Sequence, residues 1–262
     1  MFFLPASSFS DKQGIETAKL ALEHGFDGIE LWGDGLVLLS ESEIEETYRF
    51  FKDNPLKLSV HLPYLDINIA SANPDIRRVS LELSTRALIT ARRIGARLAV
   101  VHTGKPTGTK TVDFSHINIS SSEDSIYRLL QVASITGSTL LIENGVKREL
   151  FSRLDSFIAF ARKFPTAGIC LDVGHAHTMR WNFDGMKNAY DVVERIKYIH
   201  AHDNNGKYDE HKPIGYGTVK WEKIVSFLKG RIILLEIREF NDIKDFVESR
   251  EKILSLLSYF NE

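Results

Sequence analysis

Short apolar segments alternate with longer segments of helical period along most of the chain. Eight of the apolar segments have the length of a strand, and they cover residues 2–6, 28–32, 56–62, 98–102, 140–143, 168–172, 197–200 and 232–237. Continuous apolar runs such as Leu140-Leu141-Ile142 are typical of strands that are buried on both faces, as in a parallel sheet covered by helices. The alternation therefore predicts eight β/α units.

The segments between the expected strands carry helix signals. Residues 75–94 follow Pro74 and stop before Gly95, and they repeat apolar side chains near a 3.6-residue period at Ile76, Val79, Leu83, Ala87 and Ile94. A second helix is expected at residues 11–24, again with a glycine directly after it. A doubly wound sheet is the alternative architecture, but it would normally carry a glycine-rich phosphate loop after the first strand, and this sequence has none there. We therefore expect a (β/α)8 TIM barrel of the α/β class.

Length and charge bound the class of protein further. The 262 residues have the size of one barrel, with no linker-like stretch, so we expect a single domain over residues 1–262. The formal net charge of -2 gives no global basic bias of the kind that accompanies non-specific nucleic-acid binding. The single cysteine, Cys170, cannot form an internal disulfide, which fits a reducing compartment and predicts a cytoplasmic protein. No apolar run approaches the roughly 20 residues that cross a bilayer, so we expect no membrane segment.

Polar residues end the apolar runs at the positions where a barrel builds its active site, the carboxyl ends of the strands. Six of the runs end this way, at His61, His102, Glu143, Asp172, His200 and Glu236. The loops that follow add His175, Asp209 and His211. Imidazole nitrogen and carboxylate oxygen are ligands for zinc, manganese and iron, whereas a structural zinc site of the cysteine type needs more thiolates than this chain has.

A lone histidine is usually an ordinary hydrogen-bonded residue. Here, however, ionisable residues recur at the ends of six consecutive expected strands. Glu143, Asp172, Asp209 and Glu236 would repel one another strongly if no cations lay between them. The sequence therefore predicts a site for divalent metal ions, with zinc as the first choice and manganese, magnesium or cobalt as alternatives.

These motifs resemble those of the xylose isomerase-like barrel superfamily, which includes sugar isomerases and epimerases and the endonuclease IV class of abasic-site nucleases. The resemblance covers the third to the eighth expected strand. The most specific segment is Asp-Glu-His-Lys-Pro-Ile-Gly-Tyr-Gly at residues 209–217, which is similar to the nuclease pattern Asp-x-His followed by Gly-x-Gly. Tyr64 also falls where those nucleases place a tyrosine near DNA, although a tyrosine packed on the barrel rim would have the same spacing.

In the endonuclease IV branch three zinc ions are held by nine residues. The resemblance implies that the corresponding residues here are His61, His102, Glu143, Asp172, His175, His200, Asp209, His211 and Glu236. Some nuclease segments are missing: Pro5-Ala6-Ser7-Ser8 stands in place of the first DNA-binding segment, Gly145-Val146-Lys147-Arg148 replaces a Gly-Gln-Gly stretch, and Thr-Gly rather than Pro-Gly follows His102. The resemblance therefore leaves open whether the substrate is abasic DNA or another phosphoester.

In the isomerase and epimerase branch a single divalent metal is held by two glutamates, an aspartate and a histidine. Glu143, Asp172, His200 and Glu236 match that set. The resemblance then implies that His175 contacts a sugar or sugar phosphate, while the two glutamates move a proton between adjacent carbons.

We favour the nuclease-like hydrolase, because His61, His102, Asp209 and His211 would be idle in the one-metal chemistry. Glu143, Glu236 and His175 are then the expected catalytic residues, and Glu143 would bridge two metals. A barrel that binds without turnover is a third class, and it would have no use for a complete ligand set. The number of metals and the oligomeric state stay open at this point.

Three further features accompany these expected ligands. His202 shares the strand face of His200 and is a reserve ligand. Glu30 ends the second strand, where it would hydrogen-bond a substrate hydroxyl or pair with a neighbouring lysine or arginine. The loop at residues 104–110 is basic and lies on the active-site side, where it would hold a phosphate or sugar or form a solvated turn.

Overall fold

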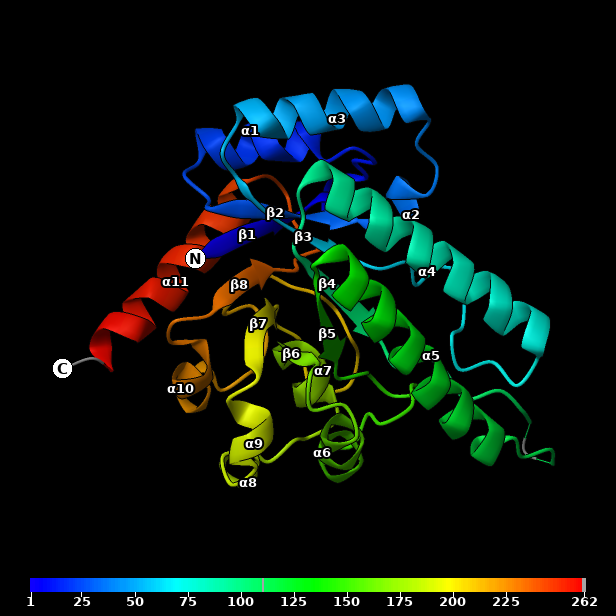
Figure 1. The fold of residues 1–262 in the computed structure, drawn as a ribbon. Helices are drawn as coiled ribbons and strands as arrows, with labels where there is room; N and C mark the ends of the chain where they lie inside the picture. The colour runs from blue at the N-terminus through cyan, green and yellow to red at the C-terminus, as the bar shows by residue number, and fades with distance from the viewer. Residues whose placement is uncertain (110, 261–262) are drawn as a thin grey trace.

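The computed structural model describes residues 1–109 and 111–260. Eight parallel strands follow one another around a closed barrel, and the last strand pairs with the first. They are β1 (Phe2–Pro5), β2 (Gly28–Trp32), β3 (Lys57–His61), β4 (Leu98–His102), β5 (Thr139–Glu143), β6 (Gly168–Asp172), β7 (Ile196–Ala201) and β8 (Ile232–Leu235). Figure 1 shows the strands at the centre with helices around them, which confirms the expected TIM barrel.

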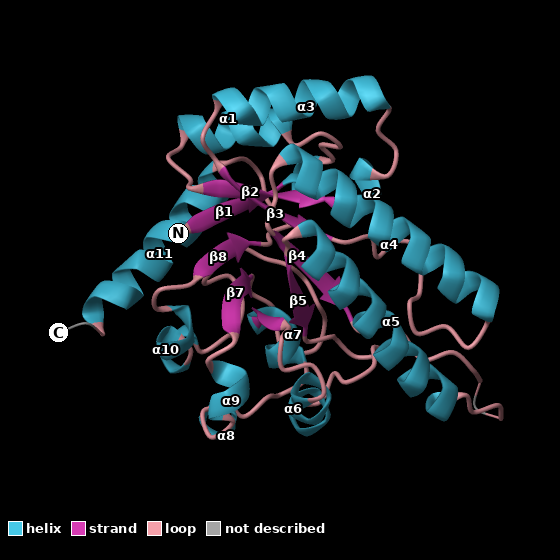
Figure 2. Ribbon diagram, viewed as in Figure 1, coloured by secondary structure: helices cyan, strands magenta, loops and turns pink. Residues whose placement is uncertain are grey.

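Helices connect successive strands and form the outer layer, as the colouring by secondary structure shows (Figure 2). The helical segments are η1 (Ala6–Phe9), α1 (Ile15–Glu23), α2 (Gly33–Leu36), α3 (Glu41–Asp53), α4 (Pro74–Ile94), α5 (Ser115–Thr136), α6 (Leu154–Arg162), α7 (Val173–Thr178), α8 (Phe183–Met186), α9 (Tyr190–Val193), η2 (Trp221–Lys223), α10 (Val225–Leu228) and α11 (Lys244–Tyr259). No helix among the described residues is both long enough and apolar enough to span a bilayer.

The first helix begins later than the sequence pattern predicts, at Ile15 rather than at residue 11. Asp11 lies outside the helix, and its carboxylate accepts hydrogen bonds from the backbone N–H groups of Gly14 at 2.9 Å and Thr17 at 2.8 Å. Gly14 has a φ of 77°, which a helical residue does not adopt. Residues 11–14 therefore form a capping turn that satisfies N–H groups at the start of the helix.

One layer of side chains fills the inside of the barrel. Six strands each contribute one buried residue to it, namely Phe3, Val100, Leu141, Cys170, Tyr198 and Leu234. The Tyr198 hydroxyl forms a hydrogen bond of 2.7 Å with the Ser59 hydroxyl of β3, so the buried phenol has a partner. Because this layer is packed with side chains, the barrel has a solid interior and is not a pore.

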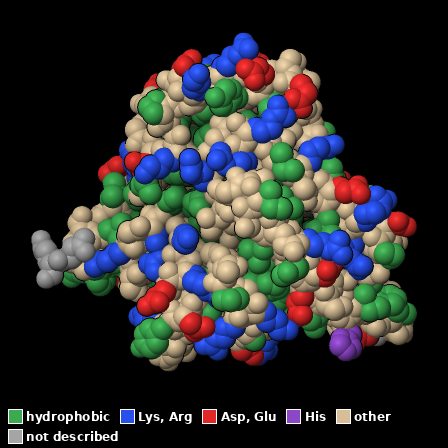
Figure 3. Space-filling view, in the orientation of Figure 1, with side chains coloured by type: hydrophobic (Ala, Val, Ile, Leu, Met, Phe, Trp, Pro, Cys, Tyr) green, Lys and Arg blue, Asp and Glu red, His purple; other side chains and the backbone are tan. Residues whose placement is uncertain are grey.

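Residues next to this layer on each strand point outward and pack against the helices. Ala99 and Val101 lie on either side of Val100 in this way, and they belong to the large core between the strands and the helices. This alternation explains why the strands read as continuous apolar runs, since both faces are buried. On the outer surface drawn in Figure 3, lysine and arginine side chains are interspersed with acidic and apolar ones.

Candidate metal centre

The candidate site is the next layer of the barrel interior, two residues further along each strand than the apolar layer. Side chains two positions apart on a strand point to the same face. The step of two leads from the interior positions of six strands to His61, His102, Glu143, Asp172, His200 and Glu236. The parallel register sets His102 opposite Glu143 and Asp172 opposite His200. The barrel thus brings all six expected strand-end residues together at the carboxyl ends of the strands.

The first group of side chains surrounds one oxygen of Glu143. Its Oε2 atom lies 3.2 Å from Nε2 of His61 and 3.5 Å from Nε2 of His102. His61 and Glu143 are buried, and only about a fifth of the His102 side chain is exposed, at 19%. Two imidazole nitrogens and a carboxylate oxygen therefore converge on one small region at the mouth of β3, β4 and β5.

The second group lies deeper and contains three carboxylates. Glu143, Asp172, His200 and Glu236 each offer one ligand atom, and these atoms lie within 4.8 Å of one another. Nδ1 of His200 is 2.9 Å from Oε2 of Glu236 and 3.2 Å from Oε1 of Glu143. The two oxygens of Glu143 thus face different groups, Oε2 toward the first and Oε1 toward the second.

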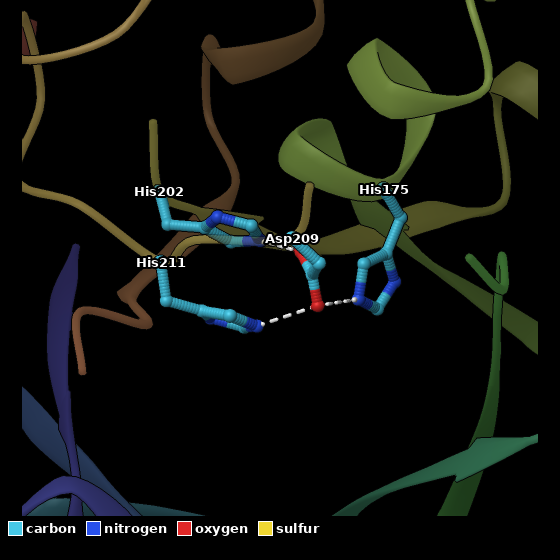
Figure 4. A group of neighbouring side chains, drawn as sticks. All are labelled: His175, His202, Asp209 and His211. Atoms are coloured by element: carbon cyan, nitrogen blue, oxygen red, sulfur yellow. Dashed lines mark hydrogen bonds and ion pairs between the residues drawn. The ribbon is translucent and has the colours of Figure 1, made fainter. Parts of the chain in front are cut away.

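The third group is formed by residues beyond the strand ends. His175, His202, Asp209 and His211 also offer ligand atoms within 4.8 Å of one another. Figure 4 shows Asp209 between the imidazoles, with one carboxylate oxygen 2.9 Å from Nε2 of His211 and 3.4 Å from Nε2 of His175. The reserve candidate His202 belongs to this group and not to the group of His200.

Four of the imidazole rings are held by a hydrogen bond at Nδ1. His61 donates to the carbonyl of Leu62 at 2.8 Å, His175 to that of Asn144 at 2.9 Å and His211 to that of Glu236 at 2.8 Å. A carbonyl oxygen only accepts, so Nδ1 carries a proton and Nε2 is the nitrogen that points toward the carboxylates. Its lone pair would become available to a cation when Nε2 gives up its own proton. Nδ1 of His102 lies 3.1 Å from Oε2 of Glu149 and is held in the same manner. Proteins orient imidazole ligands of metals in this way.

Burial and charge act in opposite directions on these groups. Burial acts to raise the pKa of Glu143, but His102 and His200 outweigh it and hold the pKa well below its ordinary value. Burial acts to lower the pKa of His175, whereas Asp172 and Asp209 raise it well above its ordinary value. Without cations, the carboxylates are therefore compensated by protonated imidazoles.

Several buried polar atoms of these groups have no well-directed hydrogen-bond partner within residues 1–109 and 111–260. They are Oε1 of Glu143, Oδ2 of Asp172, both ring nitrogens of His200, both ring nitrogens of His202, Oδ1 of Asp209 and Oε2 of Glu236. Such atoms are costly when they stay unpaired. Divalent cations accept electron pairs from these donor types, so the residues present fit one or more such ions.

The loop after β7 is held in shape by Asp203. Its carboxylate accepts hydrogen bonds from the backbone N–H groups of Gly215 and Val219 and from the indole of Trp221, at 2.9, 3.1 and 3.2 Å. A Cβ atom at Gly217 would lie 2.2 Å from an oxygen of Asp203, so this position has no room for a side chain. The glycines of the 209–217 motif therefore let the loop close over Asp203, which is why Asp203 organises the loop and does not face the metal centre.

Sequence reasoning missed some residues of the site. Glu149 lies on the loop after β5 and contacts His102, but no sequence pattern marks that position. Arg238 follows Glu236 by two residues, and its Nη2 atom lies 2.7 Å from Oε1 of Glu236. Glu30, in contrast, was expected to meet a substrate hydroxyl or a basic side chain. It is buried, and its Oε2 atom lies 3.4 Å from Nε2 of His200, whereas no ion pair joins it to a lysine or arginine among the described residues.

Two expected features lie at the edge of the site. The ring of Tyr64 packs edge-on against His61, with ring centroids 4.9 Å apart, and it lines the mouth near His102. The loop at residues 104–110 begins beside the site, where the carboxamide of Asn68 is bonded to both the N–H and the carbonyl of Lys105. Its last residue, Lys110, lies outside the described residues.

Comparisons with known proteins agree with this architecture. A model of the xylose isomerase-like TIM barrel family matches residues 18–256. An uncharacterized protein of Methanocaldococcus jannaschii is 27% identical over 100% of this chain and 89% of its own length, and a probable endonuclease 4 of Persephonella marina is 24% identical over 64% of this chain and 63% of its own length. A solved D-tagatose 3-epimerase-like protein has the same fold, with a TM-score of 0.81 at 24% identity over 99% of this chain and 98% of its own. This chain therefore belongs to the xylose isomerase-like TIM barrel family.

Proposed function

We propose that the chain is a metal-dependent hydrolase that cleaves phosphodiesters, with abasic-site DNA or another phosphoester as substrate. The observation that carries this proposal is the presence of three donor groups where the one-metal chemistry of the family needs a single group. The naming of relatives as probable endonuclease 4 supports it.

The shared carboxylate of Glu143 supports a centre with more than one ion. Its Oε2 faces His61 and His102, and its Oε1 faces His200 at 3.2 Å. A carboxylate whose two oxygens face two donor groups is suited to bridging two cations. Bound divalent ions, zinc in the first place, would supply an activated water and would stabilise negative charge on phosphoryl oxygens.

Residues at the mouth support an anionic substrate. Arg238 is 44% exposed, ion-paired with Glu236, and its guanidinium lies 5.8 Å from the ring centre of Tyr64. A guanidinium matches the geometry of phosphate oxygens, and its planar face stacks on aromatic rings. A cation that held Glu236 would compete with this ion pair and would leave the guanidinium of Arg238 available to a phosphate at the mouth. Glu143, Glu236 and His175 are the proposed catalytic residues of this site.

A second candidate function is that of a divalent-metal-dependent sugar or sugar phosphate isomerase or epimerase. The compact group of Glu143, Asp172, His200 and Glu236 favours it, since these four alone could hold one cation. In that case Glu143 and Glu236 would exchange a proton with adjacent carbons of the sugar, and His175 would contact the substrate. A small sugar is then the partner, and the third group of side chains has no part in turnover.

Under either function we propose a cytoplasmic location, because the single cysteine, Cys170, is free and buried, which fits a reducing compartment.

Metal counting combined with one substitution separates the two functions. For the hydrolase, elemental analysis of the purified protein should give two to three metals per chain, and His211→Ala should lower that number and abolish cleavage of abasic-site DNA. For the isomerase or epimerase, the count should be near one and should survive His211→Ala. The exposed residue His116 provides the control His116→Ala, which should change neither quantity. One metal per chain together with intact abasic DNA would overturn the hydrolase.

A further inference from the structure

The turn after β6 leaves a slot for the ring of His202. A Cβ atom at residue 174 would lie 2.0 Å from Cε1 and 2.3 Å from Nε2 of that ring, so only Gly174 leaves the necessary room. The carbonyl of Gly174 accepts a hydrogen bond of 2.9 Å from the side chain of Asn204, which ties the turn to the segment after His202. The backbone is thus shaped around a fully buried imidazole.

This imidazole has no ordinary structural partner among the described residues. Both of its ring nitrogens are buried without a well-directed hydrogen bond. The two nearest charged atoms to Nε2 are Oδ1 of Asp172 at 3.3 Å and Oδ1 of Asp209 at 3.6 Å. A buried polar ring that serves only for packing would be costly, since an apolar side chain would fill the same space without unpaired nitrogens.

The ring also has a defined orientation relative to the third group. It stacks on the ring of His211, with centroids 3.8 Å apart and an angle of 15° between the planes. Asp209 lies beyond the edges of both rings, with one oxygen toward each, and His175 approaches from the opposite side (Figure 4). Three imidazoles therefore surround one carboxylate.

We propose that His202 is a fourth protein ligand, which together with His175, Asp209 and His211 binds one divalent cation of the zinc type. Four protein donors fill the shell that zinc takes in closed structural sites, whereas a catalytic zinc keeps a position open for water. The ion bound here would then fix the loop of Asp209 and His211 to α7, and the open positions would lie at the two groups that share Glu143. The inference rests on the proposed metal centre but not on the reaction that this centre performs.

Nuclear magnetic resonance tests the coordination directly, with no need for turnover. The full chain, labelled with nitrogen-15 in its histidine side chains, is stripped of metal and loaded with an NMR-active isotope of cadmium in place of zinc. A ring nitrogen bonded to the cadmium is split by scalar coupling, whereas a ring nitrogen that only donates a hydrogen bond to Asp172 is not. We expect coupling at His202, His175 and His211 to one and the same cadmium resonance.

Two variants assign and control the signals. His202→Asn should remove one coupled nitrogen and should weaken the affinity of that cadmium position by more than tenfold in a competition with a chelator, whereas His116→Asn, at an exposed helical position, should change neither. If His202→Asn does not fold, the native spectrum still decides, because a cadmium coupled to only two imidazoles would overturn the proposal. An uncoupled His202 would assign it a hydrogen-bonding role toward Asp172. Because the spectrum does not depend on the reaction, a failure to cleave phosphodiesters would leave this result unaffected.

Discussion

Nδ1 of His102 lies 3.1 Å from Oε2 of Glu149, while Nε2 of the same ring lies 3.5 Å from Glu143. Glu149 accepts from Nδ1 and thereby orients Nε2 toward the metal centre, so Nε2 is the nitrogen that a cation would bind. We predict that Glu149→Gln lowers the affinity for a metal ion at the first group, which contains His61, His102 and Glu143, about 10- to 100-fold. Titration with a chromophoric chelator measures this affinity. The exposed Glu23 gives the control Glu23→Gln, and an equal loss in both variants would show that net charge, not orientation, is responsible.

Metal removal should destabilise the protein, and the effect should depend on pH in a defined direction. Burial acts to lower the pKa of His102, but Glu149 and Glu143 outweigh it and raise the pKa from 6.5 to about 9. The metal-free fold therefore holds a proton that the unfolded chain releases, and this stabilises the fold fully below pH 6.5. The contribution is lost as the pH rises through 9.

The metal-loaded protein should show the opposite trend, because protons compete with cations for the imidazoles at acid pH. The difference in melting temperature between loaded and metal-free protein should thus widen from pH 6.5 to pH 9. Thermal melts at several pH values, with and without a chelator, measure it. A constant difference across this range would mean that the imidazoles do not compensate the carboxylates in the metal-free state.

The loop that carries Asp209 and His211 should depend on Gly217. In Gly217→Ala the new methyl group would meet an oxygen of Asp203 at 2.2 Å and the carbonyl of Asn204 at 2.4 Å. We expect a loss of about 1–3 kcal/mol in the free energy of unfolding, together with weaker metal binding by His211.

Gly137 offers the matched control, since it has a φ of 70° and nothing within 4 Å of an added Cβ. Gly137→Ala should cost about 1 kcal/mol through backbone strain and should leave metal binding unchanged. Denaturant melts and metal counts on both variants make the comparison. Unchanged metal binding in Gly217→Ala would show that His211 keeps its position even when the close approach of Gly217 to Asp203 is disturbed.

Arg238 should separate a charged substrate from a neutral one. Arg238→Gln removes a guanidinium at the mouth that lies 2.7 Å from Glu236. Because a charge-assisted hydrogen bond contributes about 1.5–3 kcal/mol, kcat/KM for a phosphoester should fall by about 10- to 100-fold. A neutral sugar should lose much less. Steady-state kinetics on both substrate classes, with metal content checked in each preparation, provide the measurement.

The sequence predicted the barrel well because the strands are short apolar runs whose polar ends share one side. Residues two apart on a strand share a face, so His102 lies on the interior face of Val100 and Glu143 on that of Leu141. The position of these residues in the site therefore follows from the local sequence pattern. Glu149 could not be found in the same way, because its contact with His102 depends on how a loop folds back and not on a period. The role of Asp203 also depends on the path of a loop, because its oxygens accept hydrogen bonds from the backbone N–H groups of Gly215 and Val219 and from the indole of Trp221.

The start of α1 was also misplaced for a physical reason. Lys12 and Gln13 are good helix formers, but the carboxylate of Asp11 accepts a hydrogen bond from the N–H of Gly14, and Gly14 adopts a φ of 77° that no helix residue has. The interpretation of His202 as a reserve ligand came from its alternation with His200. In the structure β7 ends at Ala201, and His202 lies among His175, Asp209 and His211. Asp209 and His211 come from a loop whose path no strand pattern records.

The packed layer of Phe3, Tyr198 and Leu234 closes the barrel directly below the candidate centre. Ions, water and substrate must therefore use the same entrance at the carboxyl ends of the strands. A molecule bound at that entrance stands between the ions and the solvent, so ions leave slowly while it is present and quickly after it departs. The rate at which a chelator removes the metal would therefore show whether a molecule occupies the entrance. A tight-binding inhibitor would slow this rate by blocking the entrance.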